Sequence, residues 1–213
     1  MIFFLIYAII ATRTTTQSKN MNNRNFFFSS DHHFFHKNVI QYTNRPFIDV
    51  EEMNEKMIEN HNKVVTPQDI VYFVGDFAFT SDEDAVVNIL RKMNGEKHFV
   101  VGNHDKIMFK DKIRKQFNSF STASHKEIYV PDETARGGKQ SITLCHYAMR
   151  VWNKSHHGAY HLYGHSHGSL PDDPNSRSFD VGVDCWNFTP VSYEKVKEVM
   201  SQKNWTPIDH HGE

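Results

Sequence analysis

Apolar and polar residues alternate along the chain in two different rhythms from residue 25 onward. Short continuous apolar runs bounded by turn residues are typical of buried strands, whereas apolar residues three and four positions apart are typical of helices that cover a core. The first rhythm predicts strands over 26–28, 70–74, 98–101, 127–130, 141–145, 160–163 and 179–183. The second predicts helices over 49–63, from 81 to about 95, over 111–117 and over 192–202.

Two of the predicted helices carry start signals. Asp49 can cap the first, and Glu52 three positions later completes a capping-box pattern. Ser81 is predicted to cap the next helix, with Asp84 three residues later and Gly95 at its C-terminal end. The apolar faces expected to meet the core are Val50, Met53, Met57, Val64 and Val65 in the first helix, Ala85, Val86, Ile89, Leu90 and Met93 in the second, and Val196, Val199 and Met200 in the last.

The order of the elements indicates the fold class. Helices alternate with strands in the first half and the second half is richer in strands, which predicts mixed α/β layers around a sheet or a pair of sheets. A chain of 213 residues is long enough to bury a core of its own, and it contains neither an internal repeat nor an interdomain linker. We therefore predict one domain over residues 21–213.

Residues 1–20 stand apart from this pattern. Residues 1–11 form one apolar run, shorter than the roughly 20 residues that a membrane-spanning helix needs, so no stable membrane span is expected. One interpretation is a secretory signal peptide, although no Lys or Arg precedes the run and no clear cleavage site follows it. The other is that the working protein begins at Met21 and that residues 1–20 are an extension. The first interpretation predicts a secreted protein and the second a cytoplasmic one.

Composition narrows the functional classes. The formal net charge of -1 is unlike that of a protein that coats long duplex DNA, which usually carries a basic surplus. Two cysteines, Cys145 and Cys185, are too few for a disulfide framework and are expected to be ordinary buried thiols. The unusual count is 15 histidines, because histidine is the commonest metal ligand and a frequent proton carrier.

Five polar clusters follow predicted strands. In open α/β sheets, ligands bind beyond the carboxyl ends of the strands, so clusters at five strand ends can converge on one rim. Gly-Asn-His-Asp and Gly-His-Ser-His are the more specific signals, whereas an isolated Gly-Asp turn or a lone histidine is more often structural. The clusters are Asp31-His32-His33, Gly75-Asp76, Gly102-Asn103-His104-Asp105, His146 and Gly164-His165-Ser166-His167.

The residue types in these clusters suit a transition-metal site. In an extended segment residues i and i+2 point the same way, so Asp31 and His33 can reach one ion together while His32 faces elsewhere. The same geometry applies to His165 and His167. Neutral imidazoles and carboxylates are good ligands for Mn, Fe, Zn or Ni, whereas an all-oxygen site would suggest Mg or Ca. Two ions about 3.5–4 Å apart would clamp a phosphate and lower the pKa of a water between them.

Taken in order, the five clusters resemble the full signature of the calcineurin-like metallophosphoesterases, over about residues 25–200. The segments SDHHFFHKNVIQYTNRPF, VYFVGDF and CHYAMRVWNKSHHGAYHLYGHSHG are similar to those of a compact branch of small phosphoesterases from bacteria and phages. The resemblance implies two facing β-sheets flanked by helices, in a four-layer α/β/β/α sandwich. All the expected ligand positions are filled, so no departure from the pattern argues against an active enzyme.

The resemblance also implies a role for each residue of the signature. His104 is expected to stabilise charge on the phosphoryl group or to protonate the leaving oxygen, and Asp105 is expected to orient His104. The other residues are expected to bind two divalent transition-metal ions, with Asp31, His33 and His167 on the first, Asn103, His146 and His165 on the second, and Asp76 bridging both.

Three further residues are candidates for substrate contact. Arg150 lies four residues past His146 and could pair with a substrate phosphate, although a surface ion pair would explain it equally well. Trp152 could stack on a base or an aromatic leaving group, although packing in or beside the core is the commoner role. His36 lies three residues past His33 and could contact the substrate or support the ligands.

These observations predict a metal-dependent phosphoric ester hydrolase. It would cleave phosphodiester or phosphomonoester bonds of a small substrate such as a nucleotide, by attack of a hydroxide held between the two ions. The alternative is a nuclease or nucleic-acid end-processing enzyme that acts on oligonucleotides, against which the near-neutral charge counts mildly. The oligomeric state is left open.

Two readings from the same fold are less favoured. Non-catalytic protein-binding scaffolds tend to lose ligands or the histidine of the Gly-Asn-His-Asp motif, and His104 is present here. Protein Ser/Thr phosphatases carry a Gly-Asp-x-x-Asp-Arg run, whereas Gly75-Asp76 continues here as Phe-Ala-Phe-Thr.

Overall fold

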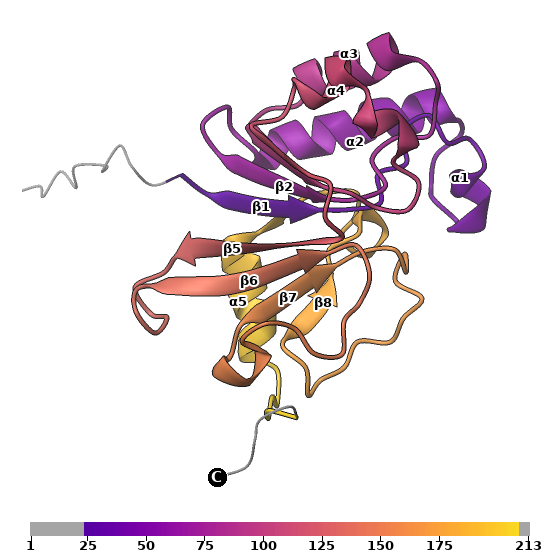
Figure 1. Cartoon of the computed structure of the whole chain (residues 1–213). Coiled ribbons are helices and arrows are strands. Elements are labelled where there is room, and N and C mark those ends of the chain that lie inside the picture. The colour runs from indigo at the N-terminus through magenta and orange to yellow at the C-terminus, as the bar shows by residue number, and fades with distance from the viewer. Residues whose placement is uncertain (1–23, 209–213) are drawn as a thin grey trace, which may run out of the picture.

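Two β-sheets face each other in the computed structural model, which describes residues 24–208 (Figure 1). The first sheet contains β1 (Phe26–Ser29), β2 (Ile70–Val74), β3 (Glu96–Val100), β4 (Ser119–Ser121) and β9 (Val191–Ser192), in the order β4-β3-β2-β1-β9. The second contains β5 (His125–Pro131), β6 (Lys139–Cys145), β7 (Tyr160–Tyr163) and β8 (Ser178–Asp180), in the order β5-β6-β7-β8. Strands β1 to β4 run parallel to one another, as do β6 to β8. Each sheet therefore gathers several carboxyl ends at one edge.

Helices flank the pair of sheets. The helices are α1 (Val39–Tyr42), α2 (Val50–Val64), α3 (Glu83–Lys92), α4 (Asp111–Arg114) and α5 (Tyr193–Ser201). Figure 1 shows α2, α3 and α4 over the outer side of the first sheet and α5 beside the second sheet. This arrangement confirms the predicted class, a mixed α/β fold of two sheets flanked by helices.

A central strand of the first sheet contributes side chains to two hydrophobic cores, because successive residues of a strand point to opposite faces. In β2, Val71 and Phe73 pack against the helices, whereas Tyr72 and Val74 face the second sheet. The run of apolar residues is continuous in this strand because the side chains on both of its faces are buried. The core between the sheets also contains Phe28 and Val100 from the first sheet, Ile128, Val130, Ile142, Leu144, Leu162 and Phe179 from the second, and Val196 and Met200 from α5.

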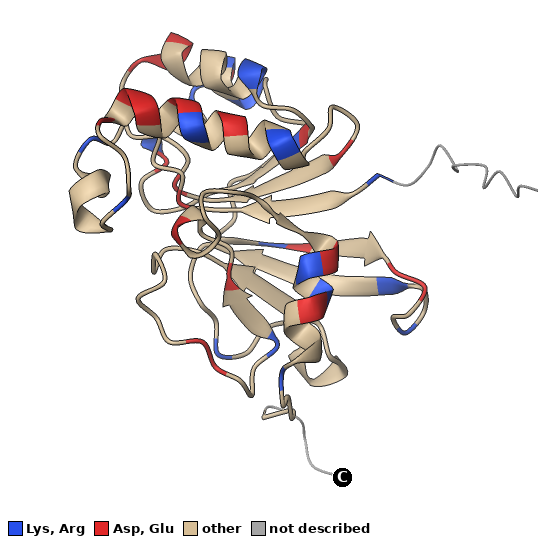
Figure 2. Ribbon diagram, turned by 180° about the vertical axis from the view of Figure 1, so that it is seen from behind, with Lys and Arg blue, Asp and Glu red and all other residues tan. Residues whose placement is uncertain are grey.

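Helix α2 begins as the sequence predicts. The Asp49 side chain accepts the backbone N–H of Glu52 at 2.8 Å, and the Glu52 carboxylate accepts the N–H of Ile48 at 2.7 Å. Met53 and Met57 are buried, but Val64 lies on the exposed side, so that part of the predicted apolar face is wrong. Acidic and basic residues alternate along the outer side of α2 (Figure 2).

Helix α3 differs from the prediction at its start. Asp82, not Ser81, caps the helix by accepting the N–H of Ala85 at 3.0 Å. A carboxylate competes well with a hydroxyl for this position. Val87 is buried, whereas the predicted Ala85 is only partly buried. The buried residues of α3 are Val86, Val87, Ile89 and Leu90.

Short elements account for the other differences. Strand β4 has the sequence Ser-Phe-Ser and β9 has two residues, so neither contains an apolar run that could predict it. The helix predicted over 111–117 ends at Arg114, and the strand predicted over 179–183 occupies Ser178–Asp180. Cys145 is buried as expected, whereas Cys185 is exposed, which corrects the prediction for that thiol.

Two other predictions concern the chain ends and membranes. The extension or signal peptide predicted for residues 1–20 lies outside the described residues. Within residues 24–208 no helix is both long enough and apolar enough to cross a bilayer.

His161 in β7 is fully buried, and both of its ring nitrogens have partners. Nδ1 lies 3.0 Å from the carbonyl oxygen of Thr143, and Nε2 accepts the N–H of Met149 at 3.0 Å. Burial lowers the pKa of His161 from 6.5 to about 4, so the ring is neutral in the folded protein at neutral pH.

Folding stability should therefore fall as the pH is lowered from 6.5 towards 4, because the unfolded chain binds a proton at His161 that the folded chain rejects. The full shift corresponds to about 3 kcal/mol in the free energy of unfolding. Urea unfolding across this window should show a shallower fall for His161→Gln than for the wild type. His125→Gln, at an exposed position of β5, should keep the wild-type slope, and equal slopes for all three proteins would contradict the assignment.

Candidate metal centre

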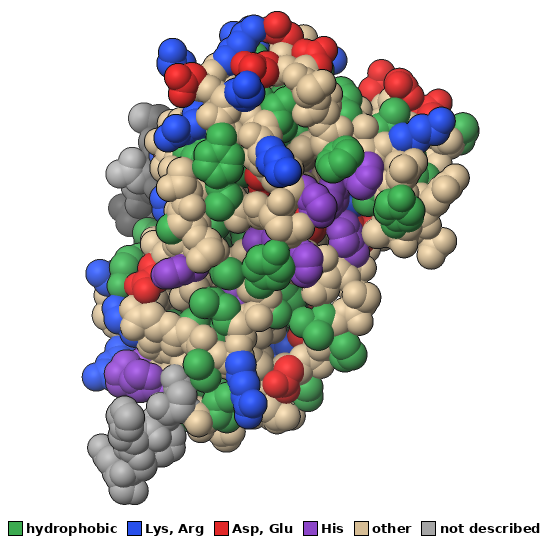
Figure 3. Space-filling model, turned by 45° about the vertical axis from the view of Figure 1, so that its right-hand side comes forward, with side chains coloured by type: hydrophobic (Ala, Val, Ile, Leu, Met, Phe, Trp, Pro, Cys, Tyr) green, Lys and Arg blue, Asp and Glu red, His purple; other side chains and the backbone are tan. Residues whose placement is uncertain are grey.

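The five predicted clusters all lie directly after strands. Asp31 follows β1, Asp76 follows β2, and Asn103 follows β3, all in the first sheet. His146 follows β6 and His165 follows β7 in the second sheet. Because these strands run parallel within each sheet, their carboxyl ends bring the side chains to one rim, and Figure 3 shows histidines gathered on this face beside hydrophobic side chains.

The backbone at this rim differs from the extended form that the spacing suggested. Five of the seven predicted ligands have positive φ angles, a region that side-chain-bearing residues seldom occupy. The common direction of Asp31 and His33 thus comes from left-handed turns, with φ of 58° and 51°, and not from an extended pleat. Such strain costs on the order of 1–3 kcal/mol per residue and is typical of functional sites. The other three residues are Asp76 (53°), His165 (70°) and His167 (47°).

Glycine lets the loops of the two sheets touch. A Cβ atom at Gly164 would overlap Ser30 Oγ and Asp31 Oδ2, so the loop after β7 can lie against the loop after β1 only with glycine at this position. Gly75 has φ of 89° and would meet the His146 ring in the same way. These two contacts join the rims of the two sheets.

The first predicted ligand group is assembled as expected. One ligand atom from each of Asp31, His33 and His167 lies within 4.8 Å of the others. His167 Nε2 is 3.9 Å from Asp31 Oδ1. His32 turns away and packs against Phe34, with 5.4 Å between the ring centroids. His32 thus faces away from the ligand group, as the spacing predicted, although the backbone at Asp31 and His33 is in a left-handed and not an extended conformation.

The second predicted group also meets in space. Asn103 Oδ1 lies 3.0 Å from His146 Nε2 and 3.1 Å from His165 Nδ1. Asp76 sits between the groups, since its Oδ2 is 3.3 Å from His146 Nε2 and 3.6 Å from His33 Nε2. The structure thus brings all seven predicted ligands together. Asp31, Asp76 and His146 form a second set with ligand atoms within 4.8 Å of one another.

The electrostatics of the rim favour a bound cation. Burial raises the pKa of Asp31 to about 7, because nearby His146 and His167 only partly offset the loss of water. Burial also disfavours the charge on Asp76, but the hydrogen bond and the charge of His146 outweigh it and lower the pKa of Asp76 to about 2. Burial lowers the pKa of His33 to about 3, which keeps this imidazole in the neutral form that binds metal ions.

Two buried side-chain atoms of the predicted ligands lack a hydrogen-bond partner within residues 24–208, and a metal ion could take its place. Asp31 Oδ1 and His33 Nε2 have no hydrogen-bond partner among the described residues, although both are shielded from water. A buried polar atom without a partner costs about 1–3 kcal/mol, so such atoms are rare unless a ligand satisfies them. The donor set of imidazole nitrogens and carboxylate oxygens suits Mn, Fe, Zn or Ni. The residues present therefore fit a transition-metal centre.

Asp105 has a different role from the one predicted. Its Oδ2 accepts the N–H groups of Gly102 and Asp76 at 2.6 and 2.8 Å, and its Oδ1 accepts that of Phe77 at 2.9 Å. These bonds tie the loop after β3 to the loop after β2, so Asp105 holds the backbone beside Asp76 instead of orienting the His104 ring. His104 itself is fixed through its backbone N–H, which donates to Asp76 Oδ1 at 2.9 Å.

Arg45 and Asp184 are two site residues that the sequence analysis missed. The Asp184 carboxylate accepts two hydrogen bonds from the buried Arg45 guanidinium, each 2.8 Å long, and contacts His167 Nδ1 at 2.7 Å. Arg45 also donates to the backbone oxygens of Asp31 and His32 at 2.7 and 2.8 Å. The pair therefore fixes both the ring of His167 and the backbone of Asp31. A signal for Asp184 was present, because it follows the predicted strand 179–183 as the other clusters follow theirs.

Asp184→Asn should weaken metal binding about 10–100-fold, because residues that orient a histidine ligand contribute this much to metal affinity. The amide keeps the shape of the side chain but loses the charge that faces His167 Nδ1. Isothermal titration of the metal-stripped protein with Mn²⁺ would measure the change. Asp172→Asn is the control, since Asp172 pairs with Lys203 at an exposed position, and an equal loss in both variants would contradict this role for Asp184.

The candidate metal centre opens into a cleft of about 670 Å³ lined by His33, His36, Asp76, His104, His165 and His167. His36 is thus placed where it can meet a substrate, and its ring stacks on Phe79 with 4.3 Å between centroids.

The structure does not bring Arg150 and Trp152 to this cleft. Both line a separate hollow, and Trp152 is buried with its indole N–H donated to the carbonyl oxygen of Ala159 at 3.0 Å. Packing, the commoner alternative, is the role that the structure supports for Trp152. The substrate contacts predicted for Arg150 and Trp152 are therefore corrected.

The chain is similar to a curated protein and to several solved structures. The uncharacterized protein MJ1445 of Methanocaldococcus jannaschii is 33% identical over 176 residues, which cover 79% of this chain and 87% of that protein. The protein of unknown function AQ665 from Aquifex aeolicus has a TM-score of 0.61 at 21% identity, over 83% of this chain and 100% of that one, which shows a shared fold. A conserved uncharacterized protein from Streptococcus pneumoniae TIGR4, described as a predicted phosphoesterase, has a TM-score of 0.36 at 15% identity over 75% of this chain and 71% of that one, which is too low to establish a common fold.

No family model matches the chain. The identity of 33% nevertheless extends over most of both sequences. On this ground the chain belongs to the same family as MJ1445 of Methanocaldococcus jannaschii.

Proposed function

We propose that the chain is a dinuclear metal-dependent phosphodiesterase related to the calcineurin-like metallophosphoesterases. The observation that carries this proposal is the convergence of seven ligand side chains from five strand ends, with Asp31 Oδ1 and His33 Nε2 buried without protein partners among the described residues. Simple packing does not explain this arrangement, because it leaves polar atoms unsatisfied and holds the backbone in strained conformations.

The two ligand groups would hold one divalent ion each. Asp31, His33 and His167 form the first group, and Asn103, His146 and His165 form the second. Asp76 has a carboxylate oxygen close to a histidine of each group, as a shared ligand requires. When bound, such ions polarise a phosphoryl oxygen and lower the pKa of a nearby water molecule.

Other residues of the chain would position the reacting groups. His104 presents its ring to the cleft, and its backbone bond to Asp76 holds it beside the metal centre. We assign to a ring nitrogen of His104 the transfer of a proton to the departing oxygen. Asp105 supports this geometry through the backbone, by keeping the loops after β2 and β3 in contact.

The charge of the cleft favours a diester over a monoester. None of the described residues that line it is Lys or Arg. A phosphomonoester carries a second negative charge near neutral pH, and no Lys or Arg among the described lining residues is available to balance it. A phosphodiester carries one charge, so bound metal ions can balance it alone. The same absence disfavours a long nucleic-acid strand, whose binding depends on neutralising several phosphates.

Exposed aromatic side chains at the cleft support a substrate with a planar group, such as a nucleotide. Tyr42 lines the cleft and is 71% exposed. Phe79 is 49% exposed beside His36, and Tyr147 is 47% exposed with its ring centroid 4.5 Å from that of His165. Rings left in water near a reactive centre are available to stack on a base.

The proposal is tested by hydrolysis of bis-p-nitrophenyl phosphate and p-nitrophenyl phosphate, measured side by side. The metal-stripped full chain is assayed alone and after reloading with Mn, Ni, Zn or Mg. We expect no turnover without metal, and faster cleavage of the diester than of the monoester after reloading. Faster cleavage of the monoester would indicate that the protein is a phosphatase and not a phosphodiesterase. Failure of the reloaded protein to cleave either compound, with two ions bound per chain, would favour a binding scaffold.

A further inference from the structure

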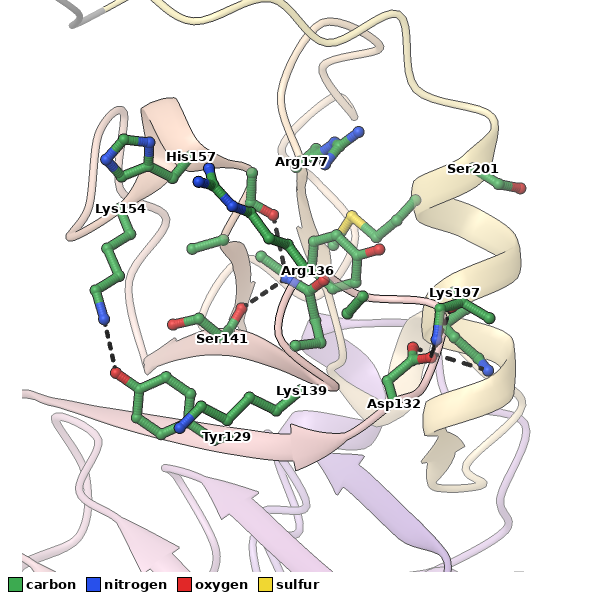
Figure 4. Close-up of a pocket in the computed structure, with 17 residues that line it drawn as sticks. Tyr129, Asp132, Arg136, Lys139, Ser141, Lys154, His157, Arg177, Lys197 and Ser201 are labelled. Carbon is green, nitrogen blue, oxygen red and sulfur yellow. Dashed lines mark hydrogen bonds and ion pairs between the residues drawn. The ribbon is translucent and has the colours of Figure 1, made fainter.

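A second large hollow lies at the other end of the second sheet from the metal centre. It has a volume of about 820 Å³ and is lined by β5, β6, their connecting hairpin, the segment before β7, and α5 (Figure 4). Lys139 and Ser141 at the start of β6 line it, whereas His146 follows the end of the same strand. The seven residues of β6 separate the two sites by roughly 20 Å, so the hollow is distinct from the candidate metal centre.

The hollow is strongly basic. Five lining residues are Lys or Arg, and Asp132 is the single carboxylate among the described residues that line it. This contrasts with the catalytic cleft, which has no Lys or Arg among its described lining residues. The five basic residues are Arg136, Lys139, Lys154, Arg177 and Lys197.

Most of this positive charge is not balanced by the protein. Lys197 forms ion pairs with Glu194 at 3.0 Å and Asp132 at 3.9 Å. Asp132 is further occupied by the Tyr193 hydroxyl, which donates to it at 2.6 Å. Within residues 24–208, the other four basic side chains form no ion pair, although most cations of α2 and α5 do. Like charges held around one hollow repel one another, so an anion placed among them would be stabilised.

Neutral contacts hold these cations in place without using their charge. Lys139 and Lys154 lie over the Tyr129 ring, with Nζ 4.7 and 5.1 Å from its centroid, and Lys154 also donates to the Tyr129 hydroxyl at 2.8 Å (Figure 4). The Arg177 guanidinium lies 4.4 Å from the centroid of Trp205, and its Nε is buried without a partner among the described residues. Such pre-positioned donors lose little conformational entropy when a ligand binds.

We propose that this hollow binds a multiply phosphorylated small molecule. Phosphates concentrate several negative charges in a small volume and accept hydrogen bonds from both the Arg fork and the Lys ammonium group. A ligand with one carboxylate would leave most of the cations unbalanced. The Tyr129 ring is occupied by two ammonium groups, so the observations assign recognition to the phosphate groups and not to a stacked base.

The proposal is tested by isothermal titration of the metal-stripped full chain, so that no phosphate can bind through a metal ion. The probes are inorganic tripolyphosphate, inorganic phosphate, ATP and a single-stranded oligonucleotide. We expect tripolyphosphate to bind much more tightly than phosphate, and the affinity to fall as salt is added. Comparable affinity for ATP would support recognition of the phosphate chain, whereas much tighter binding of ATP than of tripolyphosphate would contradict the assignment of recognition to the phosphate groups alone.

Variants locate the binding. Arg136→Gln combined with Lys139→Gln changes two exposed hairpin residues and should weaken tripolyphosphate binding about tenfold or more. Arg91→Gln combined with Lys92→Gln removes the same charge from α3 and should leave the affinity unchanged. In the wild type, tripolyphosphate should also slow hydrogen exchange of the backbone over residues 132–140.

Three outcomes would overturn the proposal. One is the absence of tripolyphosphate binding, and another is an equal loss of affinity in both double variants. The third is an oligonucleotide that binds more tightly than tripolyphosphate and more tightly still as it is lengthened, which would identify a nucleic-acid surface. Because the protein is free of metal in these titrations, Asp76→Asn should bind tripolyphosphate like the wild type, whether or not the proposed phosphodiesterase activity exists.

Discussion

Asp76→Asn should abolish most of the proposed phosphodiesterase activity while leaving the protein folded. Asp76 lies between the two ligand groups, with its Oδ2 3.6 Å from His33 Nε2 and 3.3 Å from His146 Nε2. Asparagine keeps the size of the side chain and an oxygen for the N–H of His104, but it removes the charge that two cations would share. A charge of this kind contributes several kcal/mol, so we expect kcat/KM for bis-p-nitrophenyl phosphate to fall about 10³-fold or more.

Asp69→Asn is the matched control for this experiment. Asp69 is also buried, but its carboxylate accepts hydrogen bonds from Asn25 and Thr66 before β2, at the opposite end of that strand from Asp76. We expect Asp69→Asn to lose stability and to keep nearly wild-type activity at a temperature where it is folded. The prediction is contradicted if Asp76→Asn has a normal far-ultraviolet circular dichroism spectrum and keeps more than about a tenth of the wild-type activity. Asp76 would then not be part of the catalytic site.

Arg45→Met should cost about 3–5 kcal/mol in the free energy of unfolding, because it takes the guanidinium, the permanently charged partner, away from the buried Asp184 carboxylate. Arg45 is 4% exposed and donates to Asp184 and to the backbone oxygens of Asp31 and His32. Methionine fills part of the volume but offers no donor. Urea unfolding of the metal-stripped protein would measure the loss without a contribution from metal binding.

Two further variants test the cause of that loss. Arg24→Met breaks an ion pair with Glu96 at the surface and should cost less than about 1 kcal/mol. Asp184→Asn added to Arg45→Met removes the unpaired charge and should recover part of the stability. If the double variant is no more stable than Arg45→Met alone, the loss comes from packing or from the backbone bonds, and not from the stranded carboxylate.

The positions of the predicted ligands followed from local pattern. An apolar run followed at once by Asp, Asn or His is visible in one stretch of sequence, and the parallel order of strands then brings such ends to a common edge. This pattern marked Asp31, Asp76 and His146 as candidates before their distances were known, and the resemblance to the metallophosphoesterases assigned them as ligands. Asp184 carries the same signal after the strand predicted over 179–183, so it too was within reach of the sequence.

The remaining features depend on contacts between distant segments. Arg45 and Asp184 are 139 residues apart, and nothing near either one indicates the other. The basic hollow likewise combines the β5–β6 hairpin with α5, whose cations look like ordinary surface residues when each is taken alone. The left-handed backbone at His33 and His165 and the loop-binding role of Asp105 also arise from neighbouring loops. The local pattern of the sequence determined which residues end a strand, because burial and turn chemistry act over a few residues. Which side chains then contact one another was decided by the tertiary structure, because the contacting residues lie on segments that only folding brings together.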